Sequence, residues 1–576
     1  MATITSTMTL DGSTSFTSFG RTWAWDTSDP SEGWISTITI DGRSAADAYV
    51  ANATFSGDWG TRYLRFDPDN SAPMQANITD LADGGTRLIR LLEIYENVTT
   101  NITLTDTQVH FFRGRGAGDV TLTLGTKTTN GIVLYDGNHT ITAGTGTIRS
   151  IALGDGNNTV VGTEGSRIDQ ARLGNGTNTV TVAADARIGD LWTGDGDDTI
   201  TLSGSARIYT LKMGQGDNSL TTDSGNVESV YSYMGNNTLN IGTGGVQQVV
   251  FSGEGGTHAI TSDGYPGAVQ VYQSSSTTLT LRADAGLVRL GNGGNTISLS
   301  DAASVDFIRA GDGRDTVTLA AGTEIDTLRL GMGNDVVRMN GTAVVWNADL
   351  GAGNDTVYLG STGGSIVNLG AGNDTVFLRP TPTNYETILR GGSGTDTLNL
   401  SGFNALGVTV SLETANFQSL KEGQGYLSVY GFEKLVGTKR SDTMTGSDGG
   451  NETLLGGSGN DQLNGLAGDD HLQGQGGMDK LRGGDGDDVL DGAAGRDQLW
   501  GGAGQDTFLF RARDGADTLM DFTAGEDHIQ IIGAKSLSAL SFEAKGADVE
   551  ISYRNLSILV KDSDLATLQD ADNFLF

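Results

Sequence analysis

Six aspartates recur at nine-residue intervals between residues 456 and 509. Each is the sixth residue of a block that reads Gly-Gly-x-Gly-x-Asp-x-apolar-x, as in GGSGNDQLN and GGDGDDVLD. Carboxylate and main-chain carbonyl oxygens are the ligands that a hard cation such as Ca²⁺ prefers. Turns that stack above one another would bring these oxygens together, so the spacing predicts metal binding. The candidate ligands are Asp461, Asp470, Asp479, Asp488, Asp497 and Asp506.

The rest of each block supplies the element that positions its aspartate. The glycines permit a tight, partly left-handed turn, and the x-apolar-x segment is long enough for a short strand with one inward side chain. Two blocks then close one coil, and stacked coils bury the apolar residue of the eighth position. These residues are Leu463, Leu472, Leu481, Leu490, Leu499 and Phe508.

This run resembles the RTX (repeats-in-toxin) calcium-binding β-roll over residues 437–510. Two weaker blocks precede the six regular ones. In TKRSDTMTG, Arg440 replaces a glycine, and Asp442 is a further candidate ligand; GSDGGNETLL carries one extra residue. The resemblance implies a parallel β-roll that binds Ca²⁺.

A longer period of about 20 residues precedes the roll, which indicates a solenoid over residues 111–400. The first half of each repeat is nonapeptide-like, as in TGDGDDTIT and LGAGNDTVY, and the second half reads as a strand, as in TEIDTLRLG. One coil therefore has one glycine turn and a different return path. We expect the alternating apolar residues of a coil to point into a narrow core, for example Val317, Leu319, Ile325, Leu328 and Leu330.

The sixth position of the glycine half changes along this solenoid. It is Asn158, Asn178, Asp198, Asn218 and Asn237 in the first part, and Asn295, Asp315, Asp335, Asp355, Asp374 and Asp396 in the second. Stacked carboxylates repel one another and imply bound cations, whereas stacked asparagines can hydrogen-bond as a ladder. We therefore expect the coils from Asp315 to Asp396 to bind calcium and those before Asn237 mostly not to. The alternative is that these residues are simply good turn formers.

The composition excludes some partners. A formal net charge of −34 opposes binding to nucleic acid and favours divalent cations as partners. The chain has no cysteine, and no run of about 18 apolar residues that could span a membrane. Its first residues lack the basic and apolar regions of a cleaved signal peptide. The 87 glycines recur at fixed intervals, which indicates ordered repeats rather than disorder.

Three further regions complete the predicted organisation. Residues 1–110 form an N-terminal β-rich domain, in which alternating runs predict antiparallel strands and which holds four of the seven tryptophans, Trp23, Trp25, Trp34 and Trp59. Residues 401–436 form a junction. Residues 511–576 form a C-terminal cap. The segment 506–531 resembles the one that closes many RTX rolls, which implies that Phe508, Phe510, Leu519, Phe522 and Ile529 cover the last coil. The final SDLATLQDADNFLF resembles the C-terminal signal of RTX proteins exported by type I systems; capping by Phe574, Leu575 and Phe576 is the alternative.

No catalytic constellation is evident in the sequence. The five histidines include no His-Glu-x-x-His pair, and the chain has no Gly-x-Ser-x-Gly nucleophile elbow outside its repeat turns. We therefore expect no protease or lipase activity, and the prediction is that the protein is not an enzyme. A polysaccharide lyase or epimerase, whose groove residues come from separate coils, stays open as an alternative.

These observations predict an all-β protein: a parallel β-solenoid of 20-residue coils followed by a β-roll of nonapeptide coils, with a small N-terminal β region. The predicted function is structural or adhesive, in a surface layer, sheath, filament or matrix. Calcium outside a Gram-negative cell would drive folding and assembly after type I export. The expected partners are calcium, the secretion machinery, and either further copies of the chain or a cell-surface polysaccharide. A soluble carbohydrate- or host-binding module is a further alternative.

Overall fold

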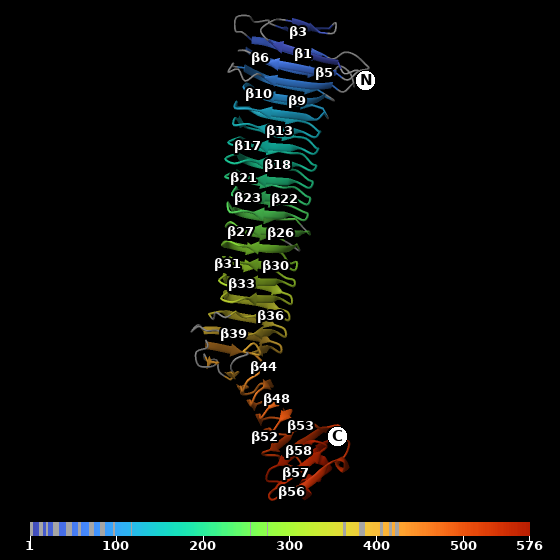
Figure 1. Ribbon diagram of the computed structural model, residues 1–576, viewed down its shortest axis with the longest axis vertical. Coiled ribbons are helices and arrows are strands. Elements are labelled where there is room, and N and C mark those ends of the chain that lie inside the picture. The colour runs from blue at the N-terminus through green and yellow to red at the C-terminus, as the bar shows by residue number, and fades with distance from the viewer. Residues whose placement is uncertain are drawn as a thin grey trace. The chain divides into compact units, whose positions relative to one another are not determined.

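The computed structural model describes residues 4–10, 15–18, 21–26, 34–41, 49–55, 59–67, 74–80, 87–95, 98–116, 118–253, 255–272, 275–360, 364–379, 386–403, 407–413, 418–420 and 426–576. Side chains are described from residue 88 onward, apart from those of Tyr95 and Val98. The chain divides into two compact units, residues 1–292 and 293–576. Each unit is mainly a stack of coils, in which successive strands of a sheet follow chain order up to the C-terminal segment (Figure 1).

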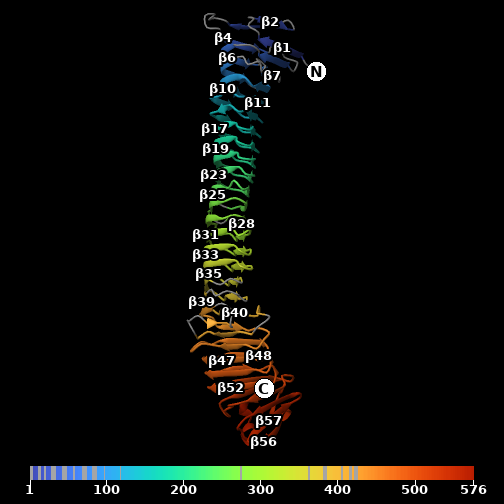
Figure 2. The same ribbon diagram turned by 60° about the vertical axis from the view of Figure 1, so that its left-hand side comes forward.

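The first unit consists mainly of two parallel sheets. One contains β1 (Ile4–Leu10), β5 (Tyr49–Phe55), β7 (Met74–Asp80), β9 (Val98–Leu104), β11 (Val120–Leu124), β13 (Thr140–Ala143), β16 (Thr159–Gly162), β18 (Thr179–Val182), β20 (Thr199–Leu202), β22 (Ser219–Thr222), β24 (Thr238–Ile241), β26 (Thr257–Ser262) and β28 (Ser276–Leu281). The other contains β4 (Trp34–Asp41), β6 (Trp59–Asp67), β8 (Arg87–Tyr95), β10 (Thr107–Arg115), β12 (Gly131–Leu134), β14 (Thr147–Ile148), β15 (Ile151–Leu153), β17 (Arg167–Arg172), β19 (Arg187–Trp192), β21 (Arg207–Lys212), β23 (Asn226–Ser232), β25 (Val246–Phe251), β27 (Pro266–Val271) and β29 (Ala285–Arg289). In the view turned by 60°, β17, β19, β23 and β25 follow one another along one side of this unit (Figure 2).

The second unit continues the same architecture with three sheets. The first contains β30 (Thr296–Leu299), β32 (Thr316–Leu319), β34 (Val336–Met339), β36 (Thr356–Tyr358), β38 (Thr375–Phe377), β40 (Thr397–Asn399), β44 (Lys434–Val436), β46 (Thr453–Ser458), β48 (His471–Gly477), β50 (Val489–Asp491), β51 (Ala494–Gly495), β53 (Thr507–Arg511), β55 (His528–Ile532) and β59 (Phe574–Leu575). The second contains β31 (Ser304–Arg309), β33 (Glu324–Met332), β35 (Val344–Ala352), β37 (Ile366–Ala371), β39 (Glu386–Ser393), β42 (Gln418–Ser419) and β43 (Tyr426–Tyr430). The third contains β41 (Thr409–Ser411), β45 (Thr443–Thr445), β47 (Gln462–Ala467), β49 (Lys480–Asp485), β52 (Gln498–Ala503), β54 (Ala516–Leu519), β58 (Leu556–Val560), β57 (Asp548–Tyr553) and β56 (Ser541–Lys545).

This architecture confirms the predicted all-β parallel solenoid. Within the described residues, helix is limited to α1 (Leu565–Leu568) and two short 3₁₀ turns, η1 (Leu537–Ala539) and η2 (Ala571–Asn573). None of these helices is long and apolar enough to cross a bilayer. The five predicted core residues of one coil, Val317, Leu319, Ile325, Leu328 and Leu330, are all fully buried.

The N-terminal region differs from its prediction. Among the described strands of this region, only β2 (Ser15–Ser18) with β3 (Arg21–Asp26), and β3 with β4, pair antiparallel. The strands β1, β5, β7 and β9, and likewise β4, β6 and β8, already pair in parallel, so the strand pairing does not change near residue 110. The prediction of antiparallel strands was wrong for most of this region, because a solenoid strand with one buried face shows the same alternation of apolar and polar residues as an antiparallel strand. The side chains of its four tryptophans lie outside the described part.

The C-terminal region closes the last coil. Phe508, Phe510, Leu519 and Ile529 are buried, and the rings of Phe508 and Phe522 lie 6.2 Å apart. Beyond them, β58 adds in parallel to β54, and β57 and β56 continue that sheet in antiparallel order. In the final segment, β59 pairs with β55, and Phe574 is buried, whereas Leu575 and Phe576 are exposed.

The close stacking of glycine turns leads to a first prediction. At Gly196, φ is +129°, and an added Cβ would lie 2.3 Å from the carbonyl oxygen of Gly176 in the adjacent coil. We expect Gly196→Ala to destabilise the first unit by at least about 1–3 kcal/mol, the usual cost of a strained backbone, because the clash adds to the strain. Thermal unfolding in excess calcium measures the effect.

Gly165→Ala is the matched control for that variant. Gly165 also has positive φ, but its added Cβ would have no atom closer than 3.8 Å. The loss expected there is the cost of the left-handed backbone alone, about 1–2 kcal/mol, without the clash. Equal losses for the two variants would contradict a role for the close approach between turns.

Candidate metal centre

The aspartates of the nonapeptide run form two ladders, one on each side of the roll. In each ladder, the main-chain N–H of one aspartate donates to Oδ1 of the aspartate 18 residues later. Examples are Asp461 to Asp479 at 2.8 Å and Asp470 to Asp488 at 2.8 Å. The spacing of 18 confirms that two nonapeptide blocks close one coil. All six predicted aspartates lie in these ladders and are at most 2 % exposed.

The 20-residue coils of the second unit form a single ladder of the same kind. The N–H groups of Asp315, Asp335 and Asp355 each donate to Oδ1 of the next ladder aspartate at 2.7 Å. Asp374 donates to Asp396 in the same way at 2.9 Å. The structure therefore brings all five of these predicted residues into one buried column.

The second carboxylate oxygen distinguishes these residues from ordinary turn formers. While Oδ1 accepts the ladder hydrogen bond, Oδ2 is buried and has no hydrogen-bond partner. Desolvating an ionised carboxylate without a partner costs several kcal/mol. In the second unit this applies to Asp315, Asp335, Asp355, Asp374, Asp396, Asp461, Asp470, Asp479, Asp488, Asp497, Asp506 and Asp517.

The asparagine coils of the first unit show which groups face that position. Nδ2 of Asn158 donates to the carbonyls of Gly154 and Gly156, four and two residues earlier, at 3.1 and 3.0 Å. Nδ2 of Asn178 does the same with Gly174 and Gly176, at 2.9 and 3.1 Å. An aspartate in this place presents an oxygen to carbonyl oxygens instead of a donor. Either a proton or a cation must then lie between the carboxylate oxygen and these carbonyl oxygens.

The donor set in the aspartate coils fits Ca²⁺. It consists of one orphaned carboxylate oxygen per glycine turn and the carbonyls of that turn, all of them oxygen atoms. The described residues contain no group of three or more His, Cys, Asp or Glu side chains that could hold a metal. A cation in the ladder would therefore depend on main-chain carbonyls for most of its ligands, as the repeat pattern predicts.

The electrostatics of the ladder reflect its burial. Desolvation raises the pKa of Asp315 and Asp355 to about 7. It raises the pKa of Asp497 to about 8, with a further contribution from the neighbouring charges of Asp517 and Asp479. The ladder hydrogen bond from a main-chain N–H lowers the pKa of each of these aspartates, but by less than burial raises it. A bound cation would offset the free-energy cost of burying these carboxylates in the ionised form.

These shifts predict how the calcium-free protein responds to pH. The folded-state pKa values of 6 to 8 lie above the value of about 3.9 for an aspartate in an unfolded chain. Between these values the folded chain binds more protons, so its free energy of unfolding falls as the pH rises from about 4 to about 8. Without calcium, we expect the melting temperature of the second unit to increase on acidification from about pH 8 to about pH 5. With saturating calcium this gain should disappear, because protons then compete with the cation for the same oxygens.

Asp442 differs from the other predicted ligands. Its Oδ2 accepts from the N–H of Thr438 at 2.6 Å, and its Oδ1 accepts from the Thr438 hydroxyl at 3.0 Å and from the N–H of Val408 at 2.7 Å. Both carboxylate oxygens thus have protein donors. The N–H of Asp442 donates to Oδ1 of Asp461, which makes Asp442 a member of the ladder. Unlike the regular sites, it has no carboxylate oxygen without a hydrogen-bond partner.

The structure adds ladder members that sequence reasoning missed. Asp517 and Asp527 accept the N–H groups of Asp497 and Asp506 and so extend both ladders past the regular repeats. Glu452, in the block with the extra residue, donates its N–H to Asp470. Asp517 and Asp527 could have been found in the sequence from the Asp-x-apolar triplets DTL (517–519) and DHI (527–529), which match positions six to eight of the nonapeptide.

Comparison with known proteins agrees with this geometry. The family model described as the RTX calcium-binding nonapeptide repeat matches residues 301–323, 447–477 and 473–508. The chain therefore carries RTX calcium-binding repeats. The matched segments include the six regular nonapeptide aspartates and Asp315, whereas Asp335, Asp355, Asp374, Asp396 and Asp442 lie outside them.

No curated protein matches the chain. Among solved structures, the chain is similar to the extracellular lipase LipA from Serratia marcescens, with 17% sequence identity and a TM-score of 0.19. The match covers 49% of this chain and 45% of that structure, so the chain spans less than half the length of the lipase. A match at this level carries no functional argument.

Proposed function

We propose that this chain is a secreted β-solenoid that folds on extracellular calcium and has a structural or adhesive role at the surface of a Gram-negative cell. The observation that carries the proposal is the column of buried aspartates whose Oδ2 atoms have no partner. Proteins with RTX repeats are typically exported by type I systems. Where free calcium is scarce, the uncompensated carboxylates oppose folding and keep the chain suited to export. Calcium outside the cell neutralises them, and the energy of metal binding then becomes folding energy.

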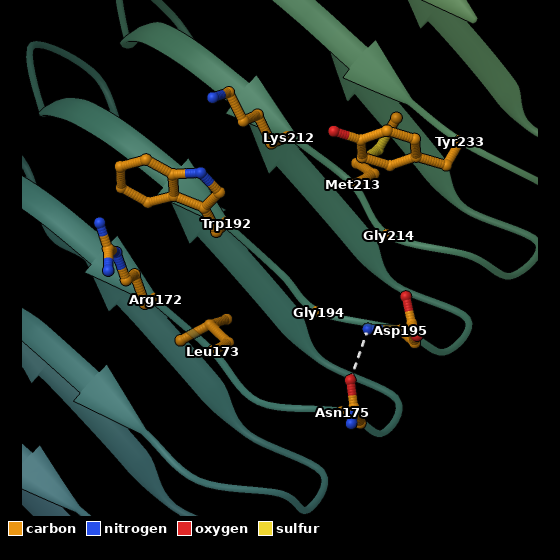
Figure 3. Close-up of a pocket in the computed structure, with 10 residues that line it drawn as sticks. All are labelled: Arg172, Leu173, Asn175, Trp192, Gly194, Asp195, Lys212, Met213, Gly214 and Tyr233. Carbon is orange, nitrogen blue, oxygen red and sulfur yellow. Dashed lines mark hydrogen bonds between the residues drawn. The ribbon is translucent and has the colours of Figure 1, made fainter. Parts of the chain in front are cut away.

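An adhesive role is supported by a groove in the first unit, on the outer side of β17, β19 and β21. Strand register aligns Arg172 with Trp192 and Trp192 with Lys212. The Arg172 guanidinium lies 4.5 Å, and Nζ of Lys212 5.6 Å, from the centroid of the Trp192 ring, so the indole holds both cations in place. Figure 3 shows the three side chains in a row on neighbouring strands.

The remaining lining of the groove has a mixed polar and aromatic character. Its volume is about 560 Å³, and Tyr233, Asn175 and Asp195 contribute to it. Tyr233 is 52% exposed, which leaves its ring accessible for stacking on a sugar. None of the ion pairs among the described residues involves Arg172 or Lys212. Cations beside an exposed ring and hydrogen-bonding side chains suit a uronate unit of an acidic polysaccharide.

The charge of the surrounding strands supports this partner. The three strands β17, β19 and β21 carry five cationic residues, Arg167, Arg172, Arg187, Arg207 and Lys212, and only two acidic ones, Asp169 and Asp190. This local excess of positive charge occurs in a chain with a formal net charge of −34. An anionic polymer would therefore be attracted to this face although the whole chain repels it.

Binding of the calcium-loaded protein to polygalacturonate, followed by calorimetry at low and high salt, tests the adhesive role. We expect the double variant Arg172→Gln/Lys212→Gln to lose about tenfold or more in affinity, because two charge-assisted contacts are removed. Arg282→Gln is the matched control, because Arg282 is an exposed cation of the same unit that pairs with Asp263. Equal affinity of the double variant and wild type would refute this site. Formation of unsaturated uronate products would favour the polysaccharide lyase alternative.

The structural role has its own test. Sedimentation of the calcium-loaded protein at increasing concentration should show association, and cell fractionation should place the protein in the envelope or matrix. A protein that stayed monodisperse and was absent from both fractions would contradict the structural role. That result would leave calcium-dependent folding untouched.

A further inference from the structure

Between residues 139 and 258, the described ladder positions of the first unit carry neutral side chains with one exception. From His139 to His258 the residues at this position are His139, Asn158, Asn178, Asp198, Asn218, Asn237 and His258. His139 makes a contact equivalent to that of the asparagine amides. Its Nε2 lies 2.7 Å from the carbonyl oxygen of Tyr135, four residues earlier. Asp198 is the one acidic member among these described positions.

Asp198 keeps its place in the ladder through one oxygen. Its Oδ1 accepts from the N–H of Asn178 at 2.9 Å and from Nδ2 of Asn178 at 3.0 Å. Its own N–H donates to Oδ1 of Asn218 at 3.1 Å. The residue is 1% exposed, and its Oδ2 is buried without a partner. This is the same arrangement as in the aspartate coils of the second unit.

The atoms around this oxygen can be identified from the neighbouring coils. In the coil of Asn178 the amide donates to the carbonyls of Gly174 and Gly176. The equivalent carbonyls in the coil of Asp198 are those of Gly194 and Gly196, and a carboxylate cannot donate to them. The hydroxyl of Thr193 is buried beside Asp198 and faces its carboxyl, where it lowers the pKa of that carboxyl by hydrogen bonding against the larger effect of burial.

We propose that Asp198 forms an isolated Ca²⁺ site in the first unit, with Oδ2 of Asp198 and the carbonyls of Gly194 and Gly196 as ligands and the Thr193 hydroxyl beside them. The cation lies between Oδ2 and these carbonyls, which the side-chain amide contacts directly in the asparagine coils. With a single carboxylate the site is a weak one, of the class that is filled at the millimolar calcium levels outside cells. Calcium then stabilises a coil of the first unit, in a segment that the RTX repeat model does not match.

Hydrogen exchange followed by mass spectrometry on the full-length protein, at about pH 8 with calcium or with a chelator, tests this site. In the wild type, peptides covering residues 190–220 should exchange about tenfold more slowly with calcium, the factor expected when free calcium exceeds the dissociation constant about tenfold. In Asp198→Asn the same peptides should exchange slowly without calcium and show no response to it, because the amide now donates to the two carbonyls. In Asp198→Ala exchange should be fast and also independent of calcium.

Asn178→Asp is the matched gain-of-site variant. It places the same carboxylate one coil earlier and should give peptides over residues 170–185 a calcium response that the wild type lacks. The proposal is overturned if peptides 190–220 of the wild type do not respond, or if Asp198→Asn keeps the full response. Peptides from residues 315–396 serve as the internal reference. A response there but not at 190–220 refutes only this site, whereas no response at either place refutes calcium-dependent folding as well.

Discussion

Removal of calcium at about pH 8 is expected to unfold the aspartate coils of the second unit while the asparagine coils of the first unit stay folded. Twelve aspartates of the second unit have an orphaned, buried Oδ2. At several kcal/mol for each uncompensated charge, the summed penalty exceeds the 5–15 kcal/mol by which a typical domain is stable. In the asparagine coils, the amides of Asn158 and Asn178 satisfy the equivalent carbonyls without any cation.

Limited proteolysis with a chelator, read out by mass spectrometry, measures this difference. Cleavage should concentrate between residues 293 and 530, while residues 118–240 resist. Added calcium should protect the second unit at a concentration that rises as the pH is lowered, because protons and calcium compete for the same carboxylates. Equal protease resistance of both segments in the chelator would show that the ladder aspartates are turn formers and not calcium ligands.

Replacing the five ladder aspartates of the 20-residue coils by asparagine is expected to make those coils independent of calcium. Oδ1 of each new side chain can still accept the ladder hydrogen bond, such as the one of 2.7 Å between Asp335 and Asp355. The new amide can donate to the two carbonyls four and two residues earlier, as Nδ2 of Asn178 does. The variant carries Asp315→Asn, Asp335→Asn, Asp355→Asn, Asp374→Asn and Asp396→Asn.

Hydrogen exchange of residues 310–400 in the presence of a chelator measures the effect. Exchange there should be strongly slowed relative to wild type, while the nonapeptide run still requires calcium. The matched alanine variant should not fold under either condition, because each substitution leaves the N–H of the previous coil without its acceptor, at about 1–3 kcal/mol per site. If the asparagine variant kept the calcium requirement of the wild type in these coils, the equivalence of amide and cation would be wrong.

Much of the fold could be predicted from the sequence because each repeat specifies its own coil. The nonapeptide period predicted coils of 18 residues, and the register of Leu463 with Leu481 has that spacing. The alternation of apolar residues predicted which side chains are buried, as for Leu328. The N-terminal strands could not be assigned in this way, since alternation alone does not distinguish parallel from antiparallel pairing.

The chain by itself determined the periods, the inward positions and the presence of aspartates in glycine turns, because these follow from local residue order. Only the tertiary structure decided which oxygens have partners, because ladder neighbours are 18 to 22 residues apart and their pairing depends on the register of whole coils. That register gives Asp442 two donors from Thr438 and leaves Asp198 alone among asparagines. It also stacks Arg172, Trp192 and Lys212 into one row, although 20 residues separate each from the next.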